Sequence, residues 1–496
     1  MKKKIKIGKC VIFMIVGVII WFGIEKVLAE PNISGWDNNA FSKVYKYSEN
    51  YDAIFLGTSM SVTNISSEEL YMNYGIRSLT LGSPEQPTYL TYYFLKEALN
   101  YQNPKVVIFD IESLFYAKEN IENRIKENEY QYVHFLLDGM KNSSSKKGAI
   151  EDAKKIVSDI NEWDYWSPMY NNHAKWENLS KSNFVNTENK SLMNGNLMLF
   201  DFDENSDRNM DIYEIENTGE VEQIDSINIQ YFEKIVDICK EKKIKLLLVR
   251  GKRQIDWDWK KYNTIQKLSN EYGLEYIDIN LLENEIGFNS KYDSADGSHL
   301  NILGAQKWTS YLGKQLVNFI AENSIEKKID KNFYKEEQRY DSLIQSIELK
   351  KRLYESLDRE ALFNVINEIV NDNKYGICIW GRKEVFDELE EDISQMLPGL
   401  EISESDTGGL YYVNNTFPIQ IEYDELNDRN SISINKKNIT INQNGLNIII
   451  YDKNNDLIIY NTFFDINVDR MKTVCRVNNS GTLQKEIEGN KWINIY

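Results

Sequence analysis

Residues 53–61 read AIFLGTSMS, and residues 296–301 read DGSHLN. The first stretch is an apolar run that ends at a glycine, which is the pattern of a buried strand followed by a turn. Ser59 lies in that turn, and in the second stretch Asp296 precedes His299 by three residues. A serine hydroxyl is a poor nucleophile at neutral pH, so acyl transfer needs a base beside it and a carboxylate that orients the base. The two stretches together predict a triad of Ser59, His299 and Asp296.

The histidine content sharpens this prediction, because the chain has only three histidines. His299 is the one with an aspartate three residues upstream in a Gly/Ser turn. His134 lies in an apolar helical segment and is expected to be a packed core residue. His173 lies in an aromatic-rich segment and has no aspartate three residues upstream.

The order of strand-like and helical segments along the chain indicates an α/β fold. Strand-like runs rich in Ile, Leu and Val occur at residues 53–57, 78–81, 105–111, 245–250 and 275–279, and helical segments occur at residues 66–74, 90–100, 226–242 and 262–272. The runs show no polar alternation, which is typical of strands buried on both faces of a parallel sheet. Alternating strands and helices predict a three-layer α/β/α domain.

Chemically useful residues follow several of these strands. Ser59, Gly82, Asp110 and Arg250 each stand at or just after a strand end. In parallel α/β sheets, functional sites gather at the carboxyl ends of the strands. The fold pattern and the triad pattern therefore point to the same rim of the sheet.

The placement of these residues resembles the SGNH/GDSL hydrolase superfamily over residues 45–325. In that family a Gly-x-Ser turn after the first strand carries the nucleophile, and a late Asp-x-x-His carries the other two groups. Ser59, Asp296 and His299 stand at those positions, and Gly82 stands where a backbone N–H helps to bind the oxyanion, together with that of the nucleophile. Residues 92–99 and 299–305 are similar to the membrane-anchored bacterial branch related to the teichoic acid D-alanylation protein and to alginate O-acetylation proteins.

One family position differs. The third block of the family offers a Gly-x-Asn-Asp whose asparagine donates to the oxyanion, whereas the corresponding strand here runs into Asp110. An ionised carboxylate cannot donate, and the loss of one donor costs about 2.7–4 kcal/mol of transition-state stabilisation. Either another side chain replaces it, with Asn64 and Ser83 as candidates, or the protein is a slow or inactive relative.

Length and charge limit the class of protein. A chain of 496 residues is expected to hold two or three domains. Its net charge of −18 repels phosphate backbones, which argues against a nucleic-acid partner. The cysteines show no metal-ligand spacing; a Cys378–Cys475 disulfide and free buried thiols both remain open. Neither glycines nor carboxylates form a phosphate or metal pattern, so no cofactor and no metal are expected.

The N-terminus predicts a single membrane-spanning anchor over residues 1–29. Five lysines up to Lys9 precede an apolar run from Cys10 to Ile24. This charge asymmetry is typical of a segment whose N-terminus stays in the cytoplasm, which would place the remainder outside the cell membrane. Val27 and Ala29 also fit a cleavage site, so a cleaved signal peptide is the alternative.

Residues 30–325 are expected to form the hydrolase-like domain, with an insertion over about residues 115–225. In the insertion Trp163 and Trp166 could contact a sugar, although aromatic residues of an insertion more often build its own small core. The segment around His173, residues 172–176, resembles a recurrent segment of the membrane-anchored branch, which implies a substrate-side role for this histidine. Arg250 follows a strand and could steer an anionic substrate, or could simply neutralise nearby carboxylates.

Residues 326–371 are highly charged and predict a helical connector. Residues 372–496 then predict a smaller C-terminal α/β domain without histidine. Residues 444–452 and 462–465 resemble the interleukin-like EMT inducer domain, also called the GG or stem domain. That resemblance implies a non-catalytic module that binds glycan or docks the enzyme.

The expected function is that of a membrane-tethered esterase or O-acyltransferase that acts outside the cell on a surface polysaccharide. The branch resemblance implies a membrane-bound O-acyltransferase as partner and favours transfer of an acetyl group, but the sequence does not distinguish transfer from hydrolysis. A non-catalytic glycan-binding scaffold and a secreted carboxylesterase for small esters are the alternatives.

Overall fold

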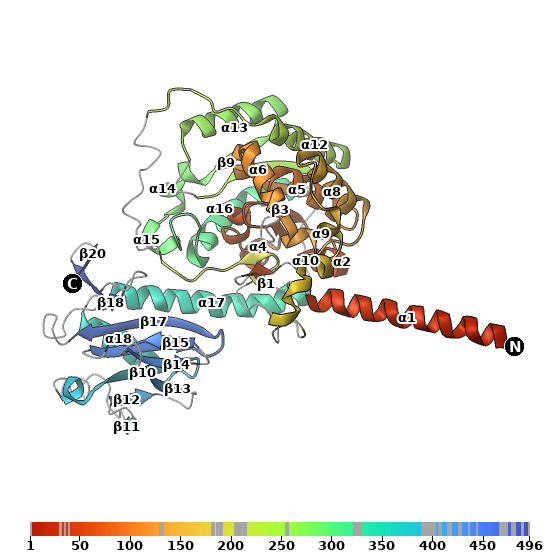
Figure 1. Cartoon of the computed structure of the whole chain (residues 1–496). Coiled ribbons are helices and arrows are strands. Elements are labelled where there is room, and N and C mark those ends of the chain that lie inside the picture. Colours follow the sequence, from red (N-terminus) through yellow and green to blue (C-terminus); the bar gives the residue numbers. More distant parts are fainter. Residues whose placement is uncertain are drawn as a thin grey trace. The chain divides into compact units, whose positions relative to one another are not determined.

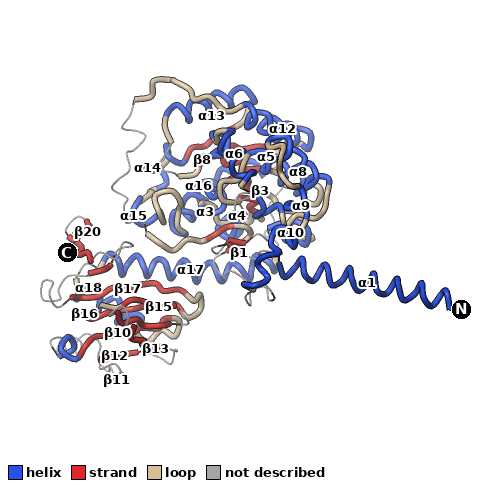
Figure 2. The backbone as a smooth tube through the Cα atoms, in the orientation of Figure 1, coloured by secondary structure: helices blue, strands red, loops and turns tan. Residues whose placement is uncertain are grey.

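The computed structural model describes the chain except at the following positions: residues 1, 29–31, 34–35, 38–39, 128–132, 180–183, 185–191, 203–215, 253–256, 321–329, 357, 388–402, 405–408, 414–418, 425–428, 435–436, 443–444, 466–474, 478–482, 488–490 and 495–496. The chain divides into two compact units, Met1–Gln338 and Arg339–Tyr496. Figures 1 and 2 show their helices and strands along the chain.

The first unit is built on a five-stranded sheet in the order β4-β3-β5-β8-β9. Its strands are β3 (Ala53–Gly57), β4 (Ser78–Gly82), β5 (Val106–Asp110), β8 (Lys245–Arg250) and β9 (Glu275–Asp278). All four neighbouring pairs are parallel. The α/β fold with a parallel sheet is therefore confirmed, and each predicted strand lies within one or two residues of its place.

Helices cover both faces of this sheet, as Figure 1 shows. On one face the side chains of Leu56, Phe109 and Leu248 share a core with α5 (Thr88–Ala98), α8 (Ser144–Ile156), α12 (Ser226–Lys242) and α13 (Trp259–Tyr272). On the other face Phe55 and Ile108 share a core with α4 (Ser67–Tyr74) and α16 (Ile302–Ile320). Strands without polar alternation fit this arrangement, because both of their faces are buried.

The order of the strands fixes where a site can form. From β3 the chain first adds β4 on one side, and then adds β5, β8 and β9 on the other. The switch point of the sheet is therefore the gap between the carboxyl ends of β3 and β5, where open α/β sheets bind their ligands. Ser59 follows β3 and Asp110 ends β5.

The predicted insertion forms short elements between β5 and α12. They are η1 (Ile111–Phe115), α6 (Lys118–Lys126), α7 (Phe135–Leu137), α8, α9 (Glu162–Trp166), α10 (Pro168–Asn172), η3 (His173–Asn178) and a hairpin of β6 (Leu192–Met193) and β7 (Asn196–Leu197). After β8, η6 (Ile279–Leu281), α14 (Glu283–Ile286) and α15 (Ser290–Asp293) lead to α16.

The N-terminal helix α1 (Lys2–Leu28) precedes β1 (Asn32–Ile33), β2 (Trp36–Asp37) and α2 (Ala40–Lys46). Its C-terminal end is held by the start of α10 and the residue before it, because Glu25 accepts hydrogen bonds from the Ser167 hydroxyl and from Met169 N–H, the latter at 3.0 Å. Asn172 also donates to the Leu28 carbonyl at 3.2 Å. Across the part of the chain that the structure describes, none of the helices is both long and apolar enough to cross a membrane.

The second unit contains an eight-stranded sheet in the order β11-β12-β10-β16-β17-β18-β19-β20. Its strands are β10 (Tyr375–Arg382), β11 (Ser403–Glu404), β12 (Gly409–Val413), β16 (Gly445–Asp452), β17 (Leu457–Asp465), β18 (Cys475–Val477), β19 (Leu483–Ile487) and β20 (Lys491–Asn494), all paired antiparallel. A smaller antiparallel sheet consists of β13 (Ile419–Asp424), β14 (Arg429–Ile434) and β15 (Lys437–Thr440). Cys378 is a free buried thiol, and burial raises its pKa to about 12.

The helices predicted as a connector exist, but they belong largely to this second unit. Leu349 and Leu353 of α17 (Lys331–Glu355) and Phe363 of α18 (Arg359–Ile369) lie in one core with Ile377 and Ile448 of the sheet. The unit therefore begins at Arg339 rather than at residue 372. The sequence of residues 384–397 also predicts a helix in the C-terminal domain, and most of these residues lie outside the described part of the chain.

Candidate active site

The nucleophile turn is the sharp connection between β3 and α3 (Ser59–Thr63). Gly57 ends the strand at φ +141°, a region that favours glycine, and a side chain there would lie 2.9 Å from Asp110 Cβ. Thr58 is the N-cap of α3, since its hydroxyl accepts a hydrogen bond from Met60 N–H at 3.3 Å. Ser59 is thus the first residue of α3 and is held at the carboxyl end of β3.

The loop before α16 supplies the other two groups. Gly297 has φ +75°, and this turn allows Ala295 N–H to donate to the His299 carbonyl at 2.8 Å. Asp296 Oδ1 accepts hydrogen bonds from the N–H groups of Ser298 and His299 at 3.0 and 2.8 Å. The loop is fastened to α3, because Leu300 N–H donates to Asn64 Oδ1 at 3.1 Å.

The structure brings the three predicted side chains together. His299 Nε2 lies 2.9 Å from Ser59 Oγ, and His299 Nδ1 lies 2.9 Å from Asp296 Oδ2. When Nδ1 carries the ring proton and donates to the carboxylate, Nε2 is left to accept the proton of the serine hydroxyl. The arrangement can therefore activate Ser59 as a nucleophile.

The charge of Asp296 is maintained by its hydrogen bonds. Burial by itself would raise the pKa of this carboxyl group, but the His299 ring and the N–H groups of Ser298 and His299 outweigh it and lower the pKa below its usual value. The carboxylate therefore stays ionised at neutral pH, as a group that orients a histidine must.

Gly82 lies against the nucleophile turn. It pairs with Gly57 in the parallel ladder, and a side chain at Gly82 would lie 3.1 Å from the Thr58 carbonyl oxygen. Only a residue without a side chain allows β4 to approach this closely, which brings the Gly82 backbone beside Ser59.

The end of β5 is occupied by acids that face the protein interior. Asp110 Oδ2 accepts a hydrogen bond from Gly251 N–H at 2.9 Å, and Oδ1 accepts one from Glu112 N–H at 3.1 Å. Glu112 in turn accepts a hydrogen bond from the Thr58 hydroxyl at 2.8 Å. Where the SGNH resemblance predicts a side-chain donor, the end of β5 thus has carboxylates that bind neighbouring loops.

Both predicted substitutes for that donor are buried, so neither is exposed to a substrate. Asn64 is buried, and its Nδ2 lies near Gly251, where an added side chain would approach it to 2.5 Å. The buried Ser83 hydroxyl donates to Gln86 at 3.1 Å. The backbone N–H groups at Ser59 and Gly82 are therefore the candidate donors that remain.

The residues predicted to contact substrate differ in how far the structure exposes them. Arg250 is only 1% exposed, so its guanidinium is not placed to contact a substrate, and Trp166 packs against the first core. Trp163 is 64% exposed. The side chain of His173 lies outside the described residues. His134 is fully buried and stacks on Tyr165, as expected of a core residue.

A hairpin that the sequence analysis missed supports the nucleophile helix from outside the sheet. Asn196 is fully buried, and its Nδ2 lies 3.3 Å from the carbonyl oxygens of both Ser61 and Val62 and 2.9 Å from Thr80 Oγ1. At the hairpin turn, Gly195 has φ +86° and lies against the Thr80 carbonyl. The Asn194-Gly195 pair is a hairpin signal that could have identified this element.

Glu68 anchors the same hairpin and is expected to make stability depend on pH. Asn194 Nδ2 donates to Glu68 Oε1 at 2.9 Å, and burial, only partly offset by Lys43, raises the pKa of Glu68 from 4.5 to about 7. Between these values the folded state holds a proton that the unfolded state lacks, so the free energy of unfolding falls as pH rises. Glu68→Gln should remove this dependence, because glutamine does not titrate.

The measurement is the melting temperature of the full chain at pH 5 and pH 8. The melting temperature of Glu68→Gln, measured relative to that of wild type, should be higher at pH 8 than at pH 5. Glu119→Gln on the exposed side of α6 is the control and should show no such gain. An equal difference at both pH values would contradict the assignment to Glu68.

Comparison with known proteins adds no relatives: no protein-family model matches the chain, and no curated protein is significantly similar to it.

Proposed function

We propose that the protein is a serine esterase or O-acyltransferase of the SGNH type that acts on a cell-surface polysaccharide. The observation that supports this proposal is the continuous line of hydrogen bonds from Ser59 Oγ through the His299 ring to Asp296 at the switch point of a parallel sheet. His299 and Asp296 side chains are 24% and 55% exposed, so an acyl group can reach them.

The mechanism follows from the roles of these groups. His299 Nε2 removes the Ser59 proton as Oγ attacks the acyl carbonyl, and Asp296 stabilises the imidazolium that forms. The backbone N–H groups of Ser59 and Gly82 stabilise the oxyanion of the tetrahedral intermediate. Collapse of that intermediate expels the alcohol, which takes the proton from His299 and leaves an acyl-enzyme on Ser59.

The second half of the reaction decides between two outcomes. His299 activates either water, which gives hydrolysis, or a sugar hydroxyl, which gives O-acyl transfer. Both acceptors use the same residues, and we propose acetyl transfer supplied through a membrane-bound O-acyltransferase partner. The second unit is proposed to be a non-catalytic module that presents the polymer.

A fluorophosphonate probe tests the central claim. It should label the full chain once, and peptide mapping should place the label on Ser59, because such probes react with activated serines. No labelling, together with retained binding of polysaccharide, would favour the alternative of a non-catalytic scaffold, which the absence of a side-chain amide donor at the end of β5 also favours.

The proposed location is outside the cell membrane, with α1 as the tether. Its side chains between Val11 and Ile24 are apolar and exposed, and lysines precede them. Deletion of residues 1–24 is expected to move the protein from the membrane fraction to the supernatant while kcat for a small ester stays unchanged. This deletion keeps Glu25, which bonds to Ser167 and Met169.

The full chain and a variant lacking residues 1–28 are the comparison proteins for this test. The longer deletion also removes the contacts of Glu25 and Leu28, so it should lower the melting temperature where the shorter one does not. Recovery of the full chain in the supernatant would contradict the tether.

A further inference from the structure

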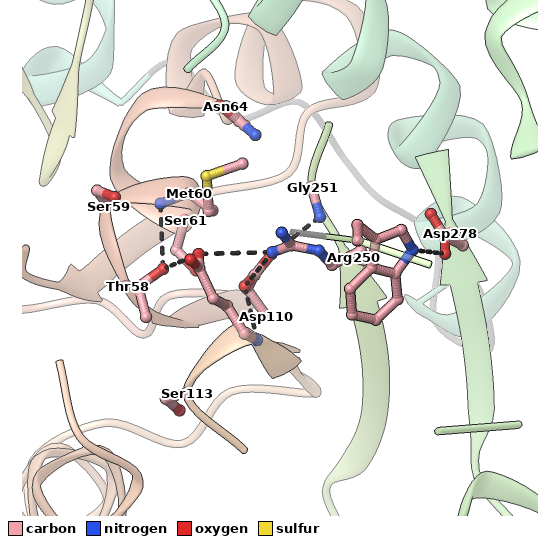
Figure 3. A network of polar contacts seen from close by, with 12 residues as sticks. Thr58, Ser59, Met60, Ser61, Asn64, Asp110, Ser113, Arg250, Gly251 and Asp278 are labelled. Atoms are coloured by element: carbon pink, nitrogen blue, oxygen red, sulfur yellow. Dashed lines mark hydrogen bonds and ion pairs between the residues drawn. The ribbon is translucent and has the colours of Figure 1, made fainter. Parts of the chain in front are cut away.

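A buried arginine between two acids lies beside the nucleophile turn, as Figure 3 shows. Arg250 at the end of β8 is 1% exposed, and its Nη1 lies 3.4 Å from Glu112 Oε2 and 3.7 Å from Asp110 Oδ1. The guanidinium also stacks over Trp257 at 4.7 Å, and the Trp257 indole N–H donates to Asp278 at 2.8 Å. Arg250 is therefore fixed from both sides.

One of these acids, Glu112, connects Arg250 to the nucleophile turn through a hydrogen bond. Glu112 Oε2, which faces Arg250, accepts a hydrogen bond from the Thr58 hydroxyl at 2.8 Å. A threonine hydroxyl has one proton, so donation to Glu112 turns its lone pairs toward Met60 N–H, which donates to it at 3.3 Å. The rotamer of Thr58 is thereby determined by a buried charge.

Thr58 and Ser59 share one peptide group, and the Ser59 N–H of that group is the proposed oxyanion donor. If Thr58 changed its rotamer or its cap, the peptide plane would turn and this N–H would point away from the developing charge. An oxyanion donor is effective only when it is already oriented, because reorientation during the reaction would cost energy.

We propose that Arg250, Glu112 and Thr58 form a positioning relay that holds the Ser59 N–H in its catalytic orientation. This inference rests on the proposed function. In the SGNH pattern the end of the strand that corresponds to β5 supplies a side-chain donor to the oxyanion. Here the residues at the end of β5 instead fix the orientation of a backbone donor. None of the three residues touches the substrate, and each acts through the next.

Steady-state hydrolysis of an activated acetyl ester by the full chain tests the relay. Thr58→Val keeps the shape of the side chain but removes its hydroxyl, and kcat should fall about 10- to 100-fold with KM nearly unchanged, because the Ser59 N–H acts on the oxyanion and not on the bound ester. Thr58→Ser retains the hydroxyl and should keep kcat within about threefold of wild type.

Glu112→Gln should also lower kcat, and the double variant Thr58→Val with Glu112→Gln should lose no more than the worse single variant. Two residues that act through one hydrogen bond are not additive, whereas two independent packing defects are. If Glu112→Gln fails to fold because Arg250 loses a partner, the Thr58→Val and Thr58→Ser pair still decides the matter.

Thr309→Val is the matched control, because this buried threonine also accepts a backbone hydrogen bond, from Ser66 N–H at 3.0 Å, but lies on α16. It should lower the melting temperature without changing kcat. A kcat for Thr58→Val within about threefold of wild type would overturn the relay and leave the proposed function standing. A wild-type protein that the fluorophosphonate probe does not label would overturn the proposed function itself.

Discussion

Ser59→Ala is expected to lower kcat for an activated acetyl ester by about 10⁴-fold or more and to abolish fluorophosphonate labelling. The Ser59 hydroxyl is the only group placed 2.9 Å from His299 Nε2, among the described side chains, that could form the acyl-enzyme. Its removal leaves the N–H donors and the base, which retain little catalysis without a nucleophile. The melting temperature should change little, because Ser59 is only partly buried.

Ser61→Ala provides the comparison for this variant. Ser61 lies on the same short helix, but its hydroxyl donates to the Leu56 carbonyl at 2.8 Å and so turns away from the histidine. The variant should still be labelled by the probe. Labelling that survives Ser59→Ala and disappears in Ser61→Ala would show that the nucleophile has been assigned to the wrong serine.

The parallel sheet could be predicted because each of its strands is a local run of apolar residues that can be recognised in the sequence alone. A strand covered by helices on both faces must be apolar at its buried positions, and residues 53–57 and 246–249 meet this requirement without reference to any distant residue. The triad residues could also be predicted from the sequence, since a chain with three histidines offers few candidates for the catalytic base. Their meeting in space follows from the sheet order, which brings separate strand ends to one rim.

The position of Arg250 was not predictable from its place after a strand, because a rim residue can point either to solvent or inward. The alternation of the strand does contain the answer. Leu246 and Leu248 face the core beneath α5 and α12, and Arg250 continues on that side, where Trp257 receives it. A buried arginine there also requires Asp110 and Glu112, two partners that are distant in sequence.

The sequence predicts the start of the second unit at residue 372, which is later than its observed start at Arg339, because the packing of a helix depends on residues distant from it in sequence. The high charge of residues 326–371 concealed two apolar stripes among many lysines and glutamates: Leu349 and Leu353 stand four residues apart on α17, and Leu362 and Ile366 stand four residues apart on α18. Helices that cover one face of a sheet need only such a stripe. Composition averaged over the segment therefore indicated a connector where periodicity indicates a packed helix.

His299→Ala is expected to reduce kcat about as much as Ser59→Ala does, because the members of a catalytic unit fail together. The two variants differ in what can rescue them. The His299 side chain is 24% exposed, so its removal opens a cavity that solvent can reach beside Ser59 Oγ. Added imidazole should enter this cavity, accept the serine proton and restore part of the rate.

The rescue should increase with imidazole concentration in His299→Ala and should be absent in Ser59→Ala, where no proton remains to be removed. Asp296 should add to it by holding the imidazole N–H, as it holds His299 at 2.9 Å, so the double variant His299→Ala with Asp296→Asn should be rescued less. Equal rescue in both His299 variants would remove Asp296 from the mechanism. Full activity of His299→Ala without imidazole would exclude a histidine base altogether, and the line of hydrogen bonds from Ser59 to Asp296 would then have no catalytic role.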